Sequence, residues 1–180
     1  MSSSRQFSAL LTARLKLRQL SDRDQERIIQ LRSDPEVHKY LERPLLRKPG
    51  EAIEFINRIN DGIARGEWYY WVISVITEGS LLGTVCLFNF SADQKVAEVG
   101  YELLPQHQGK GYMSEALEAV IDFAFQKLCL KQIDAFSHRE NSASLRLLQK
   151  KKFKADPANN QYGDPYLRYY LQDTDPWISC

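Results

Sequence analysis

The sequence predicts a single α+β domain over residues 1–180, in which helices flank a mixed, mostly antiparallel sheet of about seven strands. Three observations predict this class. The first third of the chain has helical periodicity, three strand-like runs then follow one another, and a strand-helix-strand pattern comes last. No repeat and no long Pro/Gly/Ser linker divides the 180 residues, which is the length of one domain.

The first third of the chain contains one expected strand and three expected helices. Apolar and charged residues alternate between Leu11 and Leu20, as in a half-buried strand. Ser21 is a residue type that caps helix N-termini, and Pro35 lies near the first turn of the next helix. Apolar residues then recur every three or four positions up to Gly66, which predicts the longest helix of this region.

Strands dominate the middle of the chain. Two runs rich in aromatic and β-branched residues, at 68–76 and 81–90, flank a turn and predict an antiparallel hairpin. Residues 95–104 are expected to form a third strand in succession. A helix with one continuous apolar stripe is predicted to follow over residues 110–128.

The last third is expected to complete the sheet. A strand over residues 132–137 and a helix over residues 142–151 form a crossover, and residues 153–155 and 166–171 are predicted closing strands. Antiparallel strands followed by a crossover imply a mixed sheet.

Composition narrows the function classes. The 24 Lys and Arg residues against 23 Asp and Glu residues give a net charge of +1, which does not favour nucleic-acid binding. No apolar run reaches the ~20 residues of a membrane span, and the first residues lack the apolar core of a secretion signal. Cys86, Cys129 and Cys180 fit neither a zinc site nor a disulfide framework, so we expect no metal and a reducing, cytoplasmic setting.

The turn inside residues 101–120 is the first candidate binding site. Gly109, Lys110 and Gly111 join a strand to a long helix, whose N-terminal N–H groups and dipole attract anions. A tight turn without a ligand is the alternative. Neither a P-loop nor a dinucleotide fingerprint fits, because Gly111 follows the lysine directly and Ser114 stands where a third glycine is needed.

Four ordered segments resemble the GNAT acetyltransferase superfamily, and in particular its branch of ribosomal-protein N-terminal alanine acetyltransferases. Gln106-x-x-Gly109-x-Gly111, within residues 98–125, is similar to the acyl-coenzyme A signature of that family. The other three segments are "TARLKLRQL" at 12–20, "SDPEVHKYL" at 33–41 and "ENSASLRLLQKKKF" at 140–153. The resemblance covers nearly the whole chain. It implies the GNAT fold, a V-shaped opening between the fourth and fifth strands, and acetyl-CoA as the acetyl donor.

The resemblance implies that the cofactor lies between the glycine turn and the strand before it. The pyrophosphate would bind at the turn and the helix start, at Gln108, Gly109, Lys110, Gly111, Tyr112 and Met113. The pantetheine arm would run beside the backbone of Leu103 and Leu104, where an N–H would polarise the thioester carbonyl. Asn141 would hydrogen-bond this arm, and its alternative or additional role is to cap the next helix.

The resemblance also implies direct transfer of the acetyl group to a primary amine. Glu98, at the strand glutamate of the family, is the expected general base, and Glu102 on the same face is either a second candidate or a solvated carboxylate. Ser144 matches the proposed proton donor of the ribosomal-protein branch, the alternative being a surface serine. Leu148 stands where many relatives have a proton-donating tyrosine, and Lys152 stands where a helix-ending glycine is common.

The acceptor is expected on the opposite side, between residues 33–41 and the closing strands. It would be a protein N-terminus or a small-molecule amine, and the enzyme a monomer or homodimer. A non-catalytic acyl-CoA-binding or regulatory module is the alternative from another class, because Leu148 and Lys152 depart from the family pattern. A nucleotide-binding protein that uses the same turn is a third alternative.

Overall fold

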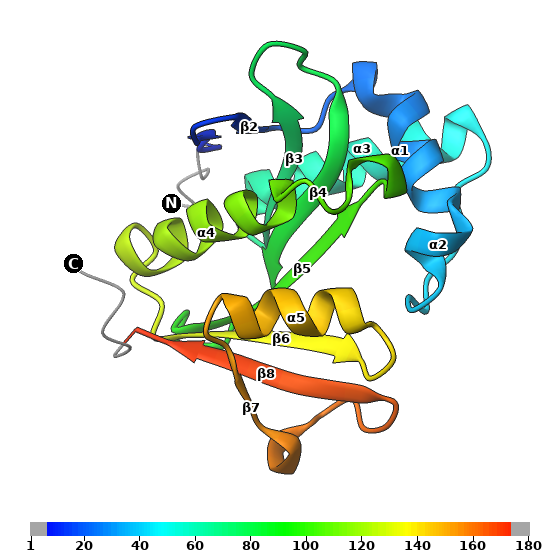
Figure 1. Cartoon of the computed structure of the whole chain (residues 1–180). Coiled ribbons are helices and arrows are strands. Elements are labelled where there is room, and N and C mark those ends of the chain that lie inside the picture. The colour runs from blue at the N-terminus through cyan, green and yellow to red at the C-terminus, as the bar shows by residue number, and fades with distance from the viewer. Residues whose placement is uncertain (1–6, 174–180) are drawn as a thin grey trace.

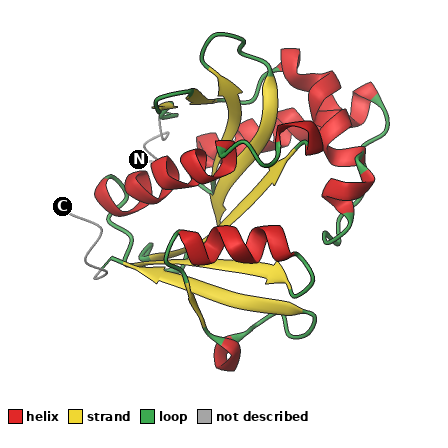
Figure 2. Cartoon of the chain, in the orientation of Figure 1, coloured by secondary structure: helices red, strands yellow, loops and turns green. Residues whose placement is uncertain are grey.

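An eight-stranded sheet runs through the protein, with helices on both of its faces (Figures 1 and 2). The computed structural model describes residues 7–173, so Cys180 lies outside the described residues. The strand order is β1-β2-β3-β4-β5-β6-β8-β7, and all neighbouring strands are antiparallel except β5 and β6. The prediction of a mixed, mostly antiparallel sheet flanked by helices is confirmed.

The elements have the following bounds. The strands are β1 Leu10–Leu11, β2 Leu15–Arg18, β3 Tyr69–Val75, β4 Leu81–Phe88, β5 Val96–Leu103, β6 Gln132–His138, β7 Lys154–Ala155 and β8 Tyr166–Gln172. The α-helices are α1 Gln25–Ser33, α2 Pro35–His38, α3 Pro49–Arg65, α4 Tyr112–Gln126 and α5 Ser142–Lys150. Within residues 7–173, none of the helices is both long and apolar enough to cross a membrane.

The sheet has one strand more than predicted, because the strand expected over residues 11–20 is interrupted. Glu115 on α4 accepts hydrogen bonds from the Thr12 hydroxyl at 2.5 Å and from the Arg14 backbone N–H at 2.9 Å. These bonds hold residues 12–14 against the helix. The chain therefore forms the antiparallel pair β1–β2 instead of one continuous strand.

Glycine conformations set the ends of the two longest helices. Gly66 adopts a φ of 74° directly after α3, as expected for a glycine that ends a helix. Pro49 and Gly50, which were expected to precede this helix, are its first two residues, because proline suits the first helical position. The α4 helix begins at Tyr112, two residues later than predicted, because the positive φ of Gly111 is incompatible with a right-handed helix.

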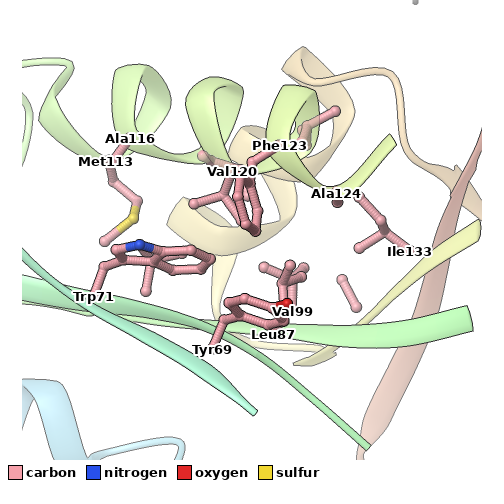
Figure 3. Packing of buried hydrophobic residues seen from close by; sticks show 14 of the residues in the cluster. Tyr69, Trp71, Leu87, Val99, Met113, Ala116, Val120, Phe123, Ala124 and Ile133 are labelled. Atoms are coloured by element: carbon pink, nitrogen blue, oxygen red, sulfur yellow. The ribbon is translucent and has the colours of Figure 1, made fainter. Parts of the chain in front are cut away.

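Two hydrophobic clusters, one on each face of the sheet, hold the helices in place. Side chains of β3 alternate between them: Tyr69 and Trp71 pack toward α4, whereas Tyr70 and Val72 pack toward α1 and α3. Phe123 of α4 meets the Trp71 ring edge-on, with ring centroids 5.4 Å apart (Figure 3). Burying a large apolar side chain contributes about 1.5–3 kcal/mol. These contacts fix α4, and with it the glycine turn at its start.

The strands β5 and β6 are paired only at one end. Their parallel register ends with Glu98 opposite Asp134, although β5 continues to Leu103 and β6 to His138. Figure 1 shows the two strands diverging beyond this pairing. The V-shaped opening predicted between the fourth and fifth strands therefore lies between β5 and β6, because the first predicted strand is two strands. Backbone groups along such an unpaired edge can bond an extended ligand.

Candidate active site

The turn between β5 and α4 has the geometry of an anion cradle. Gly109 and Gly111 adopt φ values of 72° and 80°, which side-chain-bearing residues rarely adopt. The Glu115 N–H donates to the Gly111 carbonyl, so the earlier N–H groups of the helix, at Tyr112 and Met113, have no carbonyl of their own helix to bond. A Cβ built on Gly109 would meet no atom within 4 Å. Open space therefore lies beside a set of N–H donors that suit a phosphate.

Two cations stand at this turn. Lys110 is part of it, and Arg14 reaches it from the β1–β2 connection, donating to the Lys110 carbonyl at 3.1 Å. The Arg14 guanidinium lies 4.8 Å from the centroid of the Tyr112 ring, and a Cβ on Gly111 would lie 3.3 Å from its Nη2. A 2.7 Å ion pair with Glu115 balances part of its charge. No motif in the sequence marks Arg14, because it is brought here from 96 residues away.

Gln108 is hydrogen-bonded within the turn. Its backbone N–H donates to the Pro105 carbonyl at 3.1 Å, and its side-chain amide donates to the Leu103 carbonyl at 3.0 Å. The Gln108 N–H is already bonded within the turn, and its predicted contact with the pyrophosphate stays a prediction.

The two backbone positions predicted to contact the cofactor, at the end of β5, have different hydrogen bonds. The Leu104 N–H donates to the Leu82 carbonyl at 2.9 Å, and the Leu104 carbonyl accepts from the His107 N–H at 2.9 Å. Bonding directions alternate along an antiparallel strand, so the Leu103 N–H points away from β4, toward the opening. The Leu103 N–H is therefore the donor that faces the opening, and the contact of the Leu103 and Leu104 backbone with the cofactor stays a prediction.

Across the opening, α5 presents Ser144 to β5. The Asn141 Oδ1 accepts a hydrogen bond from the Ser144 N–H at 3.1 Å, so the capping role of Asn141 is confirmed. The Ser144 Oγ lies 2.9 Å from the Tyr101 hydroxyl. Ser144 is partly buried, not an exposed surface serine. The role of Ser144 as proton donor and the role of Asn141 as cofactor ligand stay predictions.

The Tyr101 hydroxyl is a protonated partner for this serine. Burial raises the pKa of Tyr101 to about 12, and the hydrogen bond with Ser144 offsets a part of that rise. Tyr101 therefore keeps its proton at neutral pH. When Tyr101 donates to the serine oxygen, the serine proton is free to point to a third group.

Glu98 is buried on the other face of β5, at the closed end of the opening. Its carboxylate accepts hydrogen bonds from Gln161 Nε2 at 2.8 Å, Tyr162 Oη at 3.1 Å and Asn89 Nδ2 at 3.2 Å. Burial and the neighbouring Glu98 charge raise the pKa of Tyr162, so all three donors are neutral. The carboxylate is thus fixed in orientation by three neutral donors, and its role as general base stays a prediction.

Glu102 is not a solvated carboxylate, which was one of its two predicted states. Its side chain is 17% exposed and forms an ion pair with Arg43 and a longer one with Arg32 at 3.7 Å. Two guanidinium groups therefore occupy the Glu102 carboxylate, whereas the hydrogen-bond partners of Glu98 are neutral.

The two departures from the family pattern have local explanations. Lys152 adopts a φ of 65°, so a lysine takes the left-handed conformation of the usual glycine. The helix end is kept: Lys152 N–H donates to the Gln149 carbonyl and Phe153 N–H to the Leu148 carbonyl, both at 3.0 Å. The Leu148 side chain is fully buried in the core. The proton-donating tyrosine of other relatives has no counterpart at this position.

Aromatic side chains converge where the acceptor is expected. The Tyr40 ring, just after α2, lies 5.1 Å from the His138 ring at the end of β6. His138 also contacts Tyr166 of β8, and Phe136 packs edge-on against Tyr162 at 4.6 Å. These residues bring α2 and the closing strands together beside Glu98. Over residues 7–173, no group of three His, Cys, Asp or Glu side chains could hold a metal ion.

A sheet that opens between two parallel strands, beside a glycine turn with unbonded helix N–H groups and two cations, is the arrangement expected of a coenzyme A-dependent acyltransferase. The chain belongs to the GNAT acetyltransferase family: residues 14–154 match the model described as the acetyltransferase (GNAT) domain. The predicted family, the N-acetyltransferase class and acetyl-CoA as acetyl donor are thereby confirmed. The open, glycine-lined turn with its cations fits the phosphates of this cofactor.

Known proteins agree with this assignment. An uncharacterized N-acetyltransferase named p20 from Bacillus licheniformis is 35% identical over 157 residues, which are 87% of this chain and 88% of that protein. Among solved structures, a ribosomal-protein-S5-alanine acetyltransferase from Vibrio fischeri has a TM-score of 0.78 at 20% identity, covering 93% of this chain and 98% of its own. RimJ from Mycobacterium smegmatis in complex with CoA-disulfide has a TM-score of 0.75 at 19% identity, covering 88% and 81%. The similarity to these two structures is one of fold.

Proposed function

We propose that the protein transfers the acetyl group of acetyl-CoA to a primary amine by direct attack in a ternary complex. The amine belongs to a protein N-terminus or to a small molecule. The observation that carries this proposal is the placement of side chains on β5. Tyr101 contacts Ser144 on one face of the strand, and Glu98 is buried on the other. Bound acetyl-CoA supplies a thioester whose carbonyl carbon an amine can attack.

The cofactor phosphates have a defined set of partners in this proposal. The glycine turn lets the backbone approach, and the free N–H groups at the start of α4 donate to the phosphate oxygens. Charge is balanced by two side chains, Lys110 and Arg14. The binding residues are Gly109, Lys110, Gly111, Tyr112 and Met113 in the cradle, with Arg14 beside it, and Leu103 and Asn141 along the pantetheine arm.

Proton transfer is divided between the two faces of β5. An ammonium group is not nucleophilic, so the Glu98 carboxylate accepts a proton from the incoming amine, directly or through a water. On the other face the Ser144 Oγ–H donates toward the departing sulfur, while the Tyr101 hydroxyl holds the serine oxygen in place. The Leu103 N–H is available to polarise the thioester carbonyl.

The acceptor is tested by mass spectrometry of a pooled amine panel, with peptides and small amines together. Because the fold neighbours include a ribosomal-protein alanine acetyltransferase, protein N-termini are the first acceptors to try.

We also expect the enzyme in the reducing cytoplasm, because Cys86 and Cys129 are free thiols.

Glu98→Gln tests the catalytic assignment, and the exposed Glu54→Gln on α3 is the matched control. We expect the Glu98 variant to lower kcat about 100-fold or more with unchanged acetyl-CoA affinity, as for loss of a general base. The control should match the wild type. Tight acetyl-CoA binding without acetylation of any amine and without thiol release would instead support the non-catalytic acyl-CoA-binding module.

A further inference from the structure

Two nearly buried arginines lie on the face of β5 that is opposite α4. Arg32 belongs to α1, and Arg43 lies in the segment between α2 and α3. Their side chains are 12% and 15% exposed. Both contact Glu102: Arg43 through a hydrogen-bonded ion pair and Arg32 at 3.7 Å.

The single negative charge of Glu102 does not balance the two positive charges of Arg32 and Arg43. The Arg43 Nε and Nη1 and the Arg32 Nε are buried and have no hydrogen-bond partner. Burial raises the pKa of the neighbouring Cys86 thiol to about 12 and raises that of the Tyr70 phenol, so neither is an anion at neutral pH. Buried cationic donors are normally paired, because leaving them unpaired is costly. The cluster of Arg32, Arg43 and Glu102 therefore has a net positive charge, which one more anion would neutralise.

Further positive charge lies close to Arg32. Its guanidinium lies 4.3 Å from the centroid of the Phe55 ring, and the Arg58 guanidinium lies 5.5 Å from the same centroid. Burial lowers the pKa of Arg32, Glu102 opposes this, and repulsion from Arg43 and Arg58 adds to the lowering. An anion bound here would relieve that repulsion.

The arginine pair lies on the side where the acceptor is expected. Glu102 shares a face of β5 with Glu98, and four residues of strand place them about 13 Å apart. The Arg43 carbonyl lies 2.5 Å from Nε2 of His38, which ties this segment to α2. Tyr40, just after α2, packs on His138, which is one of the converging aromatic side chains beside Glu98. An acceptor whose amine reaches Glu98 can therefore extend along β5 toward the arginines.

Resting on the proposed acetyl transfer, we propose that Arg32 and Arg43 bind a carboxylate of the acceptor. Guanidinium groups bind carboxylates through paired N–H donors, which is the bonding that these two side chains lack. The span from Glu98 requires a carboxylate several bonds away from the reacting amine. The substrates are thus amines with an acidic side chain, either N-terminal peptides with Asp or Glu near the first residue or free dicarboxylic amino acids.

Matched acceptors test this inference. Peptides that differ only in Asp against Asn, or Glu against Gln, near the N-terminus are compared, and glutamate is compared with glutamine. We expect kcat/KM to be about thirtyfold higher for the acceptor with the carboxylate than for the matching acceptor with the amide. The amide would leave the buried guanidinium N–H donors without an anionic partner. The peptide and amino-acid arms separate the two sources of the carboxylate.

Variants in the same segment separate recognition from structure. Arg43→Gln should reduce the acidic-to-amide ratio to near one, and Arg43→Lys should keep part of it. The exposed Arg47→Gln is the matched control and should keep the wild-type ratio. An equal loss for both acceptors in Arg43→Gln would show a structural role and overturn the inference.

The wild-type ratio decides the inference even if a variant does not fold. A ratio of one or less, or a preference for polyamines, would overturn carboxylate recognition while leaving acetyl transfer intact. Failure to acetylate any amine despite acetyl-CoA binding would instead overturn the proposed function. The two failures are therefore distinguishable.

Discussion

Gly109→Ala distinguishes a turn that binds phosphate from a turn that only reverses the chain. The glycine has a φ of 72°, and a Cβ there would meet no atom within 4 Å, so alanine fits without a clash. The cost to folding is the strain of a left-handed conformation, about 1–2 kcal/mol. The new methyl group occupies open space beside the N–H donors, where a phosphate must approach.

The expected loss of affinity follows from one blocked hydrogen bond. A hydrogen bond to a charged group contributes about 1.5–3 kcal/mol. Losing one such bond weakens acetyl-CoA binding about 10- to 150-fold. Isothermal titration of acetyl-CoA measures this directly, and thermal unfolding reports the strain separately.

Gly79→Ala is the matched control, because Gly79 has a φ of 69° and open space around a built Cβ but lies in the β3–β4 turn. Both variants should lose about 2 to 8 °C in Tm for a strain of 1–2 kcal/mol in a chain of this size. Only Gly109→Ala should lose affinity for acetyl-CoA. Equal affinity in the wild type and both variants would refute the cradle, since the turn would then have only a structural role.

Three further predictions concern catalysis and stability. Tyr101→Phe should lower kcat about fivefold by loss of one hydrogen bond. The double variant Tyr101→Phe with Ser144→Ala should have the same kcat as Ser144→Ala alone. Additive effects of the two substitutions would show that Tyr101 and Ser144 act independently. Lys152→Gly should raise Tm by about 2–4 °C, because relief of left-handed strain exceeds the entropy cost of glycine by about 1 kcal/mol; an unchanged or lower Tm would count against strain at this position. Asp24→Asn should lower the free energy of unfolding by about 3–5 kcal/mol at pH 7, because it breaks the buried pair with Arg18 at 2.6 Å. Burial raises the pKa of Asp24, but hydrogen bonds from Arg18 and Ser21 lower it overall. This stabilisation is present above the unfolded pKa of about 4 and lost as pH falls through the lower folded value, so the difference in urea midpoints should shrink below pH 4.

Local patterns in the sequence predicted most elements of the fold. The apolar stripe of α4 and the glycine after α3 depend on residues three or four positions apart, which is the range that periodicity reports. The interruption between β1 and β2 was missed, because it depends on Glu115, about one hundred residues later in the chain. Nothing local distinguishes Thr12 or Arg14 from residues of a continuous strand.

The candidate site shows the same limit. Residue types and position indicated the glycine turn, resemblance indicated Ser144, and strand alternation put Glu98 and Glu102 on one face of β5. Alternation also turned Tyr101 the other way, but its contact with Ser144 joins residues 43 positions apart. The contact between Arg43 and Glu102 spans 59 positions and places Glu102 in a partly buried ion pair, which excludes the solvated state that was one of its two predicted alternatives. Such pairings depend on how elements pack, which neither propensity nor motif spacing encodes.

The core of the fold also sets the chemistry of β5. Val99 and Leu103 are buried against α4, so the residues between them alternate onto defined faces of the strand. Tyr101 lies with these apolar residues and contacts Ser144 of α5, whereas Glu98 and Glu102 lie on the opposite face of the strand. A slip of one residue in register would exchange the two sets, placing both carboxylates in the core. The burial that stabilises β5 therefore also keeps Tyr101 on the face that meets Ser144 and keeps Glu98 on the opposite face.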